Sequence, residues 1–176
     1  MPLTLSDELM PIAIEVFAQV CNRIATLLPG TEVHHVGATA ISGALTKGDL
    51  DVVVRVEAGD FAATIEKLRT AFLVKQPENW DPYFASFGID TEYPLPVGVQ
   101  LVIIDSEADF FLFVRDYLAS HPDALAAYNR AKRESLGLSP GDYWKAKDRV
   151  LAPIVSLKAQ QVKRPTEPVR SSREEL

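Results

Sequence analysis

Two aspartates separated by one residue, Asp49 and Asp51, stand directly before the apolar run Val52–Val54. In an extended strand, side chains two residues apart project from the same face, so the two carboxylates are expected side by side. Neighbouring carboxylates repel each other unless a cation lies between them, and Mg²⁺ prefers a few carboxylates with water and phosphate oxygens. The spacing therefore predicts that Asp49 and Asp51 bind Mg²⁺ or Mn²⁺.

A small-residue turn precedes the aspartates. Gly37, Ala38 and Thr39 offer a backbone that can approach a phosphate closely, N–H groups for its oxygens and the hydroxyl of Thr39. Lys47, two residues before Asp49, is either a further phosphate contact or a lysine of a solvated loop. The turn and the aspartates together predict a site for a nucleoside triphosphate (NTP) and its metal ion.

These features also have purely structural interpretations. Asp49 and Asp51 could face water from an exposed strand edge, and Gly37 could serve only a turn. The valine run after the aspartates argues instead for a buried strand. The binding site is therefore the favoured interpretation.

The segment His35–Ala40 resembles a signature of the GrpB family, within the DNA polymerase β-like nucleotidyltransferase superfamily. It matches the family pattern His-x-Gly-Ser-Thr-Ala at five of six positions, with Ala38 in place of the serine. Two further blocks follow in the family's order. The second is Phe113–Leu118 with His121-Pro122, Ala127-Tyr128 and Ala131–Arg133, and the third is Tyr143 with Lys145–Lys147. The resemblance implies an α+β fold, with a small mixed β-sheet flanked by helices.

The resemblance spans residues 8–160 and implies an activity as well as a fold. It implies transfer of a nucleotidyl group from an NTP to an unknown acceptor, with Asp49 and Asp51 as catalytic metal ligands. Basic helix residues bind phosphate in this superfamily, so Arg115 and Lys132 are expected to contact the nucleotide. Otherwise they are solvated helix residues with weak ion pairs.

The sequence departs from the family pattern in two places. Ala38 cannot donate the hydrogen bond that the serine of the Gly-Ser pair is expected to give to a phosphate. Active superfamily members also carry a third carboxylate on a later strand, where this chain has Gln100 and Val102, with Asp105 as the nearest acid. Two functions remain open: a nucleotidyltransferase, or a catalytically degenerate domain that binds a nucleotide, a phosphorylated ligand or a protein partner.

Composition limits the partners. The 176 residues are 47% hydrophobic with a formal net charge of −6, which fits a folded domain and argues against binding of extended nucleic acid. Cys21 is the single cysteine, so no intrachain disulfide is expected. The N-terminal sequence lacks a basic region, and no apolar run reaches the ~18 residues of a membrane span, so a cytoplasmic location is expected.

Apolar periodicity predicts one domain over residues 1–162 and a flexible tail over residues 163–176. Strands are expected at residues 32–36, 50–56 and 97–104, with loops and short strands between residues 75 and 96. Helices are expected at residues 6–28, 39–45, 60–72, 122–136 and 139–160. A further helix is expected to begin at Ser106, with Asp109 in a capping-box-like position.

Overall fold

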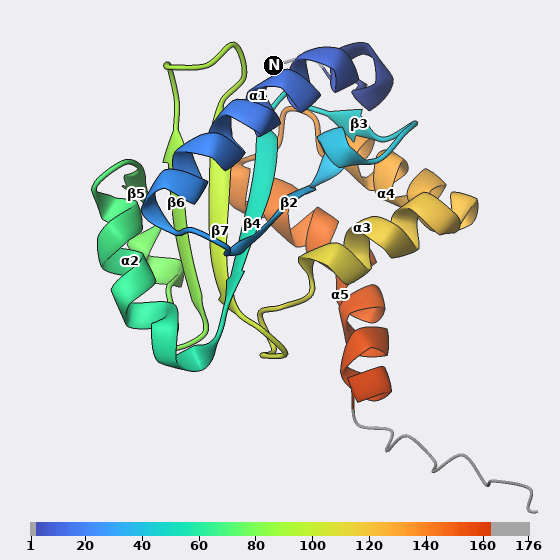
Figure 1. Cartoon of the computed structure of the whole chain (residues 1–176). Coiled ribbons are helices and arrows are strands. Elements are labelled where there is room, and N and C mark those ends of the chain that lie inside the picture. Colours follow the sequence, from blue (N-terminus) through green and yellow to red (C-terminus); the bar gives the residue numbers. More distant parts are fainter. Residues whose placement is uncertain (1–2, 163–176) are drawn as a thin grey trace, which may run out of the picture.

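A mixed five-stranded sheet organises the chain, in the order β2-β4-β7-β6-β5 (Figure 1). The strands are β2 (Glu32–Val36), β4 (Leu50–Val56), β5 (Leu73–Lys75), β6 (Phe84–Ile89) and β7 (Val97–Ile103). The β4–β7 pair is parallel, and the other three pairs are antiparallel. The computed structural model describes residues 3–162, so the tail expected from residue 163 lies outside the described residues. The α+β fold with a mixed sheet confirms the sequence prediction.

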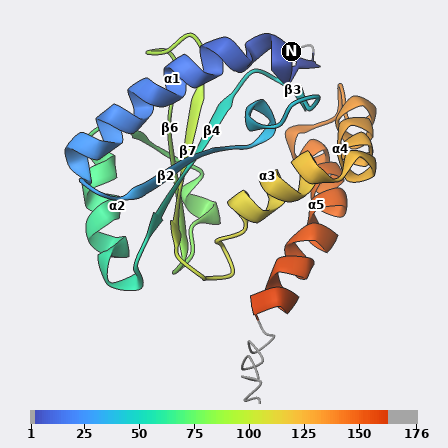
Figure 2. The same ribbon diagram turned by 45° about the vertical axis from the view of Figure 1, so that its right-hand side comes forward.

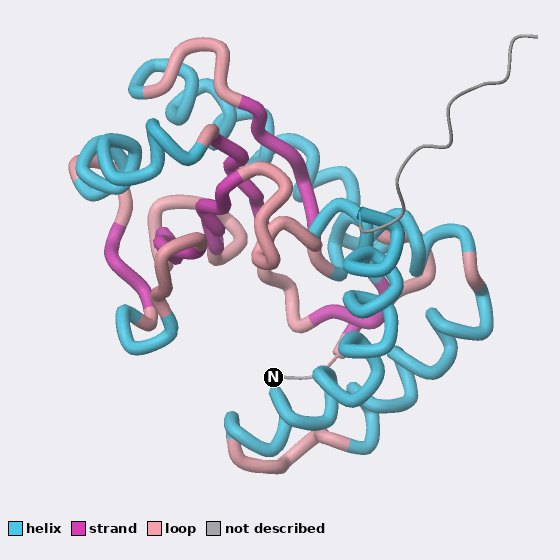
Figure 3. The backbone as a smooth tube through the Cα atoms, turned by 90° about the horizontal axis from the view of Figure 1, so that it is seen from below, coloured by secondary structure: helices cyan, strands magenta, loops and turns pink. Residues whose placement is uncertain are grey.

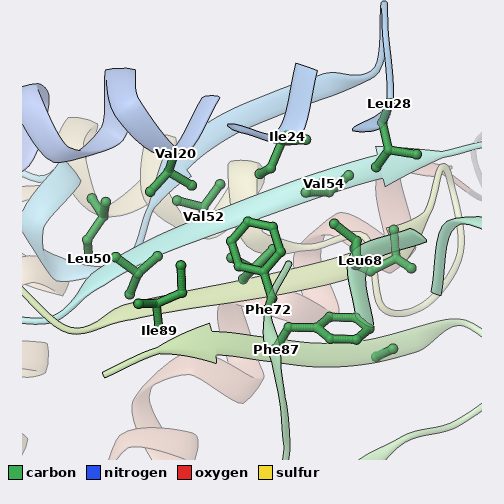
Figure 4. Packing of buried hydrophobic residues seen from close by; sticks show 14 of the residues in the cluster. Val20, Ile24, Leu28, Leu50, Val52, Val54, Leu68, Phe72, Phe87 and Ile89 are labelled. Atoms are coloured by element: carbon green, nitrogen blue, oxygen red, sulfur yellow. The ribbon is translucent and has the colours of Figure 1, made fainter. Parts of the chain in front are cut away.

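The first face of the sheet packs against two helices. Strand β4 presents Leu50, Val52 and Val54 to this face, where α1 (Ser6–Leu27) and α2 (Phe61–Arg69) cover them. The packed apolar side chains include Val20, Ile24, Leu28, Leu68, Phe72, Phe87 and Ile89 (Figure 4). Because burial of apolar surface is the main stabilising term in folding, this cluster fixes strand β4 in place.

The C-terminal helices gather on the other side of the sheet (Figure 2). They are α3 (Phe111–Ser120), α4 (Pro122–Glu134) and α5 (Pro140–Val162). On this face Val53 of β4 packs in one cluster with Val102 of β7 and Phe111. Figure 3 shows the strands with helices on both sides. Among the described residues, no helix combines the length and apolar character needed to cross a membrane.

The prediction of a helix over residues 39–45 is wrong. The chain instead makes a 3-10 turn at Ala38–Ala40 and then strand β3 (Leu45–Thr46). Strand β3 pairs antiparallel with β1 (Thr4–Leu5), and the N–H group of Ser6 donates to the carbonyl group just before β3 at 2.8 Å. Backbone bonds to a distant segment therefore decide this conformation, and local periodicity does not reveal them.

The predicted helix start at Ser106 is also wrong, because α3 begins at Phe111. Asp109 instead accepts two hydrogen bonds from the guanidinium of Arg55, at 2.8 Å from Nε and 2.7 Å from Nη2. The ammonium of Lys158 lies 3.3 Å from the same carboxylate. Asp109 therefore ties the segment before α3 to strand β4 and to α5.

Candidate functional site

The carboxylate of Asp51 lies against the glycine turn. Asp51 pairs with Val36 across β4 and β2, so the turn that follows β2 passes directly beside it. Gly37 has a φ of 71°, and a Cβ built there would lie 2.7 Å from Cβ of Asp51 and 2.8 Å from its Cγ. Glycine therefore satisfies both the backbone conformation and the close approach.

Asp49 and Asp51 line the same cavity, of about 360 Å³, which we call the first cavity. Asp49 is exposed just before β4, whereas Asp51 is half-buried on the strand. Burial and the neighbouring charge of Asp49 raise the pKa of Asp51 to about 6, although the charge of Lys147 and the amide of Gln100 act in the opposite direction. Such a shift is expected where two carboxylates share a site without a cation.

Three lysines also line the first cavity, Lys47, Lys132 and Lys147. The ammonium of Lys47 lies 3.3 Å from the ring centroid of Tyr143, and that of Lys132 lies 4.2 Å from the ring centroid of Tyr128. The first cavity thus combines carboxylates that suit a cation with ammonium groups that suit an anion.

Lys132 is buried, with 3% of its surface exposed, so its interpretation as a solvated helix residue is wrong. Its ammonium donates a hydrogen bond to the backbone carbonyl of Leu45. Burial lowers the pKa of Lys132 to about 7, and the charge of Lys147 acts in the same direction. Lys132 therefore joins α4 to strand β3 and also faces the first cavity.

Two lysines of α5 take different positions. Lys147 is half-buried and lines the first cavity, whereas Lys145 is exposed, with its ammonium 3.5 Å from the carboxylate of Asp142. Burial lowers the pKa of Lys147, while the charges of Asp51 and Asp49 raise it. As their spacing on a helix predicts, only one of the two lysines faces the site.

The side chain of Thr39 does not offer the expected hydroxyl to a phosphate. It is fully buried, and its Oγ1 donates to the backbone carbonyl of Asp49 at 3.2 Å. Nε2 of His35 lies 3.0 Å from Oγ1 of Thr39, and the imidazole of His35 stacks on Phe17. Burial, assisted by the charge of Arg115, lowers the pKa of His35 to about 4. The neutral imidazole and the threonine therefore position the segment that carries Asp49.

Gln100 stands on β7 beside Asp51, on the strand where active superfamily members carry a third carboxylate. Gly98 is the register partner of Asp51, and Gln100 follows two residues later on the same face. Nε2 of Gln100 donates to Oδ1 of Asp51 at 3.3 Å. Asp105 lies beyond the end of β7 and is exposed. Within residues 3–162, no group of three or more His, Cys, Asp or Glu side chains is arranged to hold a metal ion.

A cavity of about 460 Å³, the second cavity, also borders Asp51. Arg115 lines this second cavity and not the first, so Arg115 and Lys132 do not converge. Nη1 of Arg115 donates to the backbone carbonyl of His35 at 2.9 Å, and its Nε donates to Asp116 at 2.8 Å. The six predicted nucleotide-binding residues therefore do not form one cluster.

Some lining residues were not predicted from the sequence. Tyr128 borders both cavities, and Phe84, Phe110 and Phe111 line the second. Tyr128 belongs to the second block that resembles the GrpB family, which is the sequence signal that marks it. The phenylalanines come from β6 and from the start of α3, and nothing local in the sequence indicates that they meet.

Comparisons with known proteins show which family the chain belongs to. The family model described as GrpB protein matches residues 11–156. The UPF0157 protein VC_A0354 of Vibrio cholerae is 27% identical over 151 residues, covering 85% of this chain and 79% of the relative. The UPF0157 protein PA4798 of Pseudomonas aeruginosa is 29% identical over 140 residues, covering 76% of this chain and 57% of the relative.

Two solved structures share the fold. The crystal structure of conserved protein GrpB from Enterococcus faecalis has a TM-score of 0.67 at 18% identity, over 88% of this chain and 96% of that chain. The Cid1 poly(U) polymerase with MgGTP bound has a TM-score of 0.51 at 12% identity, over 73% of this chain and 42% of that chain. The fold is that of the nucleotidyltransferases, and the chain belongs to the GrpB family.

Proposed function

We propose that the first cavity binds an NTP together with Mg²⁺ or Mn²⁺, and that the bound nucleotidyl group is transferred to an acceptor. The observation that carries this proposal is the position of Asp51, which lies against the Gly37 turn and shares a cavity with Asp49. Burial and then the charge of Asp49 raise the pKa of Asp51, and a divalent cation would offset both by stabilising the charged carboxylate. The donor set fits Mg²⁺, which takes a couple of carboxylates and completes its shell with water and phosphate oxygens.

The lysines of the first cavity support binding of a polyphosphate. Lys47 lines it from the loop before β4, and Lys147 lines it from α5. Ala38 also lines it, so we assign the backbone of the Gly37 turn to the phosphate contacts in place of a side-chain hydroxyl. A bound metal ion supplies charge neutralisation of the triphosphate. The chain's own groups hold and orient the nucleotide.

A domain that binds the nucleotide without transfer is the second candidate, and Gln100 favours it. The third carboxylate of active superfamily members activates the attacking hydroxyl. The amide of Gln100 cannot take a proton as a carboxylate does, and its Nε2 is directed to Asp51. Slow or absent transfer is therefore expected from the second candidate.

Thermal unfolding with each of the four NTPs, with and without Mg²⁺, tests nucleotide binding. A ligand that binds only the folded state raises the melting temperature, so we expect stabilisation that needs both Mg²⁺ and the NTP. Replacing Asp49 and Asp51 together by alanine should abolish this effect, whereas Lys145→Ala should retain it. No stabilisation by any NTP would contradict both candidates.

Single-turnover assays with α-labelled NTPs, and cell extract as the source of acceptors, separate the two candidates. Label transfer that disappears in Asp49→Ala supports a nucleotidyltransferase. Nucleotide binding without label transfer supports the binding domain. The two assays together therefore decide between them.

A further inference from the structure

The second cavity differs in chemistry from the lysine-rich first cavity. Its volume of about 460 Å³ lies in the range of roughly 300–1,000 Å³ that is typical of sites for small organic ligands. Asp51, Tyr128 and Lys147 border both cavities. A ligand in the second cavity and a nucleotide in the first would therefore meet at the same carboxylate.

Three phenylalanine rings line the second cavity, Phe84 from β6 and Phe110 and Phe111 at the start of α3. The centroids of Phe84 and Phe111 lie 6.3 Å apart with 15° between the ring planes. Those of Phe110 and Phe111 lie 4.5 Å apart with 20° between the planes. Val114 and Leu118 of α3 add aliphatic surface. Nearly parallel rings beside aliphatic side chains suit a planar apolar group.

Gln100 places a hydrogen-bond acceptor, to which no described residue donates, in the lining of the second cavity. Its Nε2 donates to Asp51, which fixes the orientation of the amide. Its Oε1 is buried and has no hydrogen-bond partner within the part of the chain that the structure describes. A buried acceptor without a partner is destabilising, so a ligand that brings an O–H or N–H donor would be favoured.

We propose that the second cavity binds the acceptor of the transfer, a small molecule with an aromatic body and a hydroxyl group that donates to Oε1 of Gln100. This inference rests on the proposed function, since the NTP in the first cavity supplies the nucleotidyl group. The acceptor oxygen bonds to the α-phosphorus, and the bond from this phosphorus to the bridging oxygen of the β-phosphate breaks. Pyrophosphate leaves with the electron pair of that bond, and the hydroxyl proton passes to water.

A nucleic-acid strand fits the second cavity less well. Binding of single strands requires a positively charged groove that follows the backbone. The basic residues that line the cavity are Arg115 and Lys147, and Arg115 already donates to His35 and Asp116. The chain as a whole carries a formal net charge of −6. A small acceptor is therefore the better match.

Two probe compounds test the proposal, 2-phenylethanol and ethylbenzene, which share an aromatic body and differ in the hydroxyl group. Their affinities for the full chain are measured by ligand-observed NMR titration. We expect the wild type to prefer the alcohol by about tenfold, the contribution of one hydrogen bond to a buried acceptor. Gln100→Leu should remove this preference and still bind ethylbenzene.

A second variant tests the place of binding. Val114 lines the second cavity and not the first, so Val114→Trp should fill the second cavity and abolish binding of both compounds. Binding of MgATP by this variant shows that it is folded. If Val114→Trp does not fold, the preference measured with Gln100→Leu still decides.

Three results would overturn the inference: no binding of either probe to the wild type, an unchanged alcohol preference in Gln100→Leu, or displacement of the probes by a short oligoribonucleotide. Failure of the proposed function gives a different result. In that case MgATP does not bind, although the alcohol binds as expected. The second cavity is then not the acceptor site of a transfer reaction, but it still binds an aromatic compound with a hydroxyl group.

Discussion

Gly37 and Asp51 form a single structural unit, because a Cβ on Gly37 would overlap the carboxylate of Asp51. The glycine turn and the paired aspartates are separate motifs in the sequence, with a spacer that contains β3 between them. The antiparallel pairing of Val36 with Asp51 brings them together. The place of the Asp51 carboxylate therefore depends on the residue at position 37.

Gly37→Ala should destabilise the protein more than Gly30→Ala. Both glycines have positive φ, 71° and 77°, but a Cβ on Gly30 would have no neighbour within 4 Å. Gly30→Ala should cost about 1–2 kcal/mol for the left-handed conformation alone. Gly37→Ala should cost about 1–3 kcal/mol more, because of the overlap with Asp51 and because φ 71° with ψ −167° is a conformation that essentially only glycine adopts. Urea unfolding measures both free energies, and equal losses would contradict the close contact.

Asp51→Asn should make the metal-free protein more stable at neutral pH. Burial and the charge of Asp49 raise the pKa of Asp51 to about 6, above the ~3.9 of an aspartate in an unfolded chain. The folded state therefore binds the proton of the Asp51 carboxyl group more tightly than the unfolded state does. The stability that this proton contributes is complete below about pH 4 and is lost as the pH rises through about 6. Above that pH the variant should exceed the wild type by about 1–3 kcal/mol.

Urea unfolding between pH 4 and pH 8, in the presence of a chelator, checks this difference. The two proteins should have similar stability near pH 4, where Asp51 is protonated. Asp49→Asn removes the neighbouring charge, so the pH at which stability falls should move downward. Parallel pH profiles for Asp51→Asn and the wild type would show that the Asp51 carboxylate has an ordinary pKa.

Local patterns were sufficient to predict the centre of the fold. The strands expected at residues 32–36, 50–56 and 97–104 appear as Glu32–Val36, Leu50–Val56 and Val97–Ile103. Their signal is apolar sequence bounded by turn residues, which depends on neighbours along the chain. The same geometry predicts a shared face for Asp49 and Asp51. Both residues line the first cavity, although Asp49 lies just before β4 and not on the strand.

Residues whose environment depends on distant partners were not predicted. Lys132 occurs among polar helix residues, yet it is buried because its ammonium reaches the carbonyl of Leu45. Asp109 resembles a helix cap, yet it binds Arg55 on strand β4. The aromatic lining of the second cavity has the same origin, since β6 and α3 meet only in the folded chain. A single sequence carries no local record of such contacts.

Lys147→Ala should weaken binding of MgATP, and Lys145→Ala should not. The two lysines lie two residues apart on α5, but Lys147 borders the first cavity while Lys145 is exposed beside Asp142. Loss of one ammonium group near a triphosphate should lower the affinity roughly tenfold or more. Isothermal titration at fixed ionic strength compares the variants, and equal affinities would place the phosphates away from α5.

Gln100→Glu should increase the stabilisation of the protein by Mg²⁺. The substitution adds a third carboxylate on the face of β7 that contacts Asp51, where Nε2 of Gln100 now lies 3.3 Å from Oδ1. Without metal, the new charge replaces a hydrogen-bond donor beside Asp51, so the variant should be less stable than the wild type at pH 8. With Mg²⁺, the added carboxylate can bind the metal ion or accept a hydrogen bond from its bound water, so the rise in melting temperature should be larger.

Gln100→Leu is the control for this change, because it removes the same donor without adding a carboxylate. It should lose stability without any gain in the effect of Mg²⁺. If a missing third acid limits nucleotidyl transfer, label transfer from an NTP should also rise in Gln100→Glu and stay low in Gln100→Leu. An effect of Mg²⁺ that is equal in the wild type and in both variants would show that the metal ion does not bind beside Asp51, and would remove the basis for a metal-dependent function at this site.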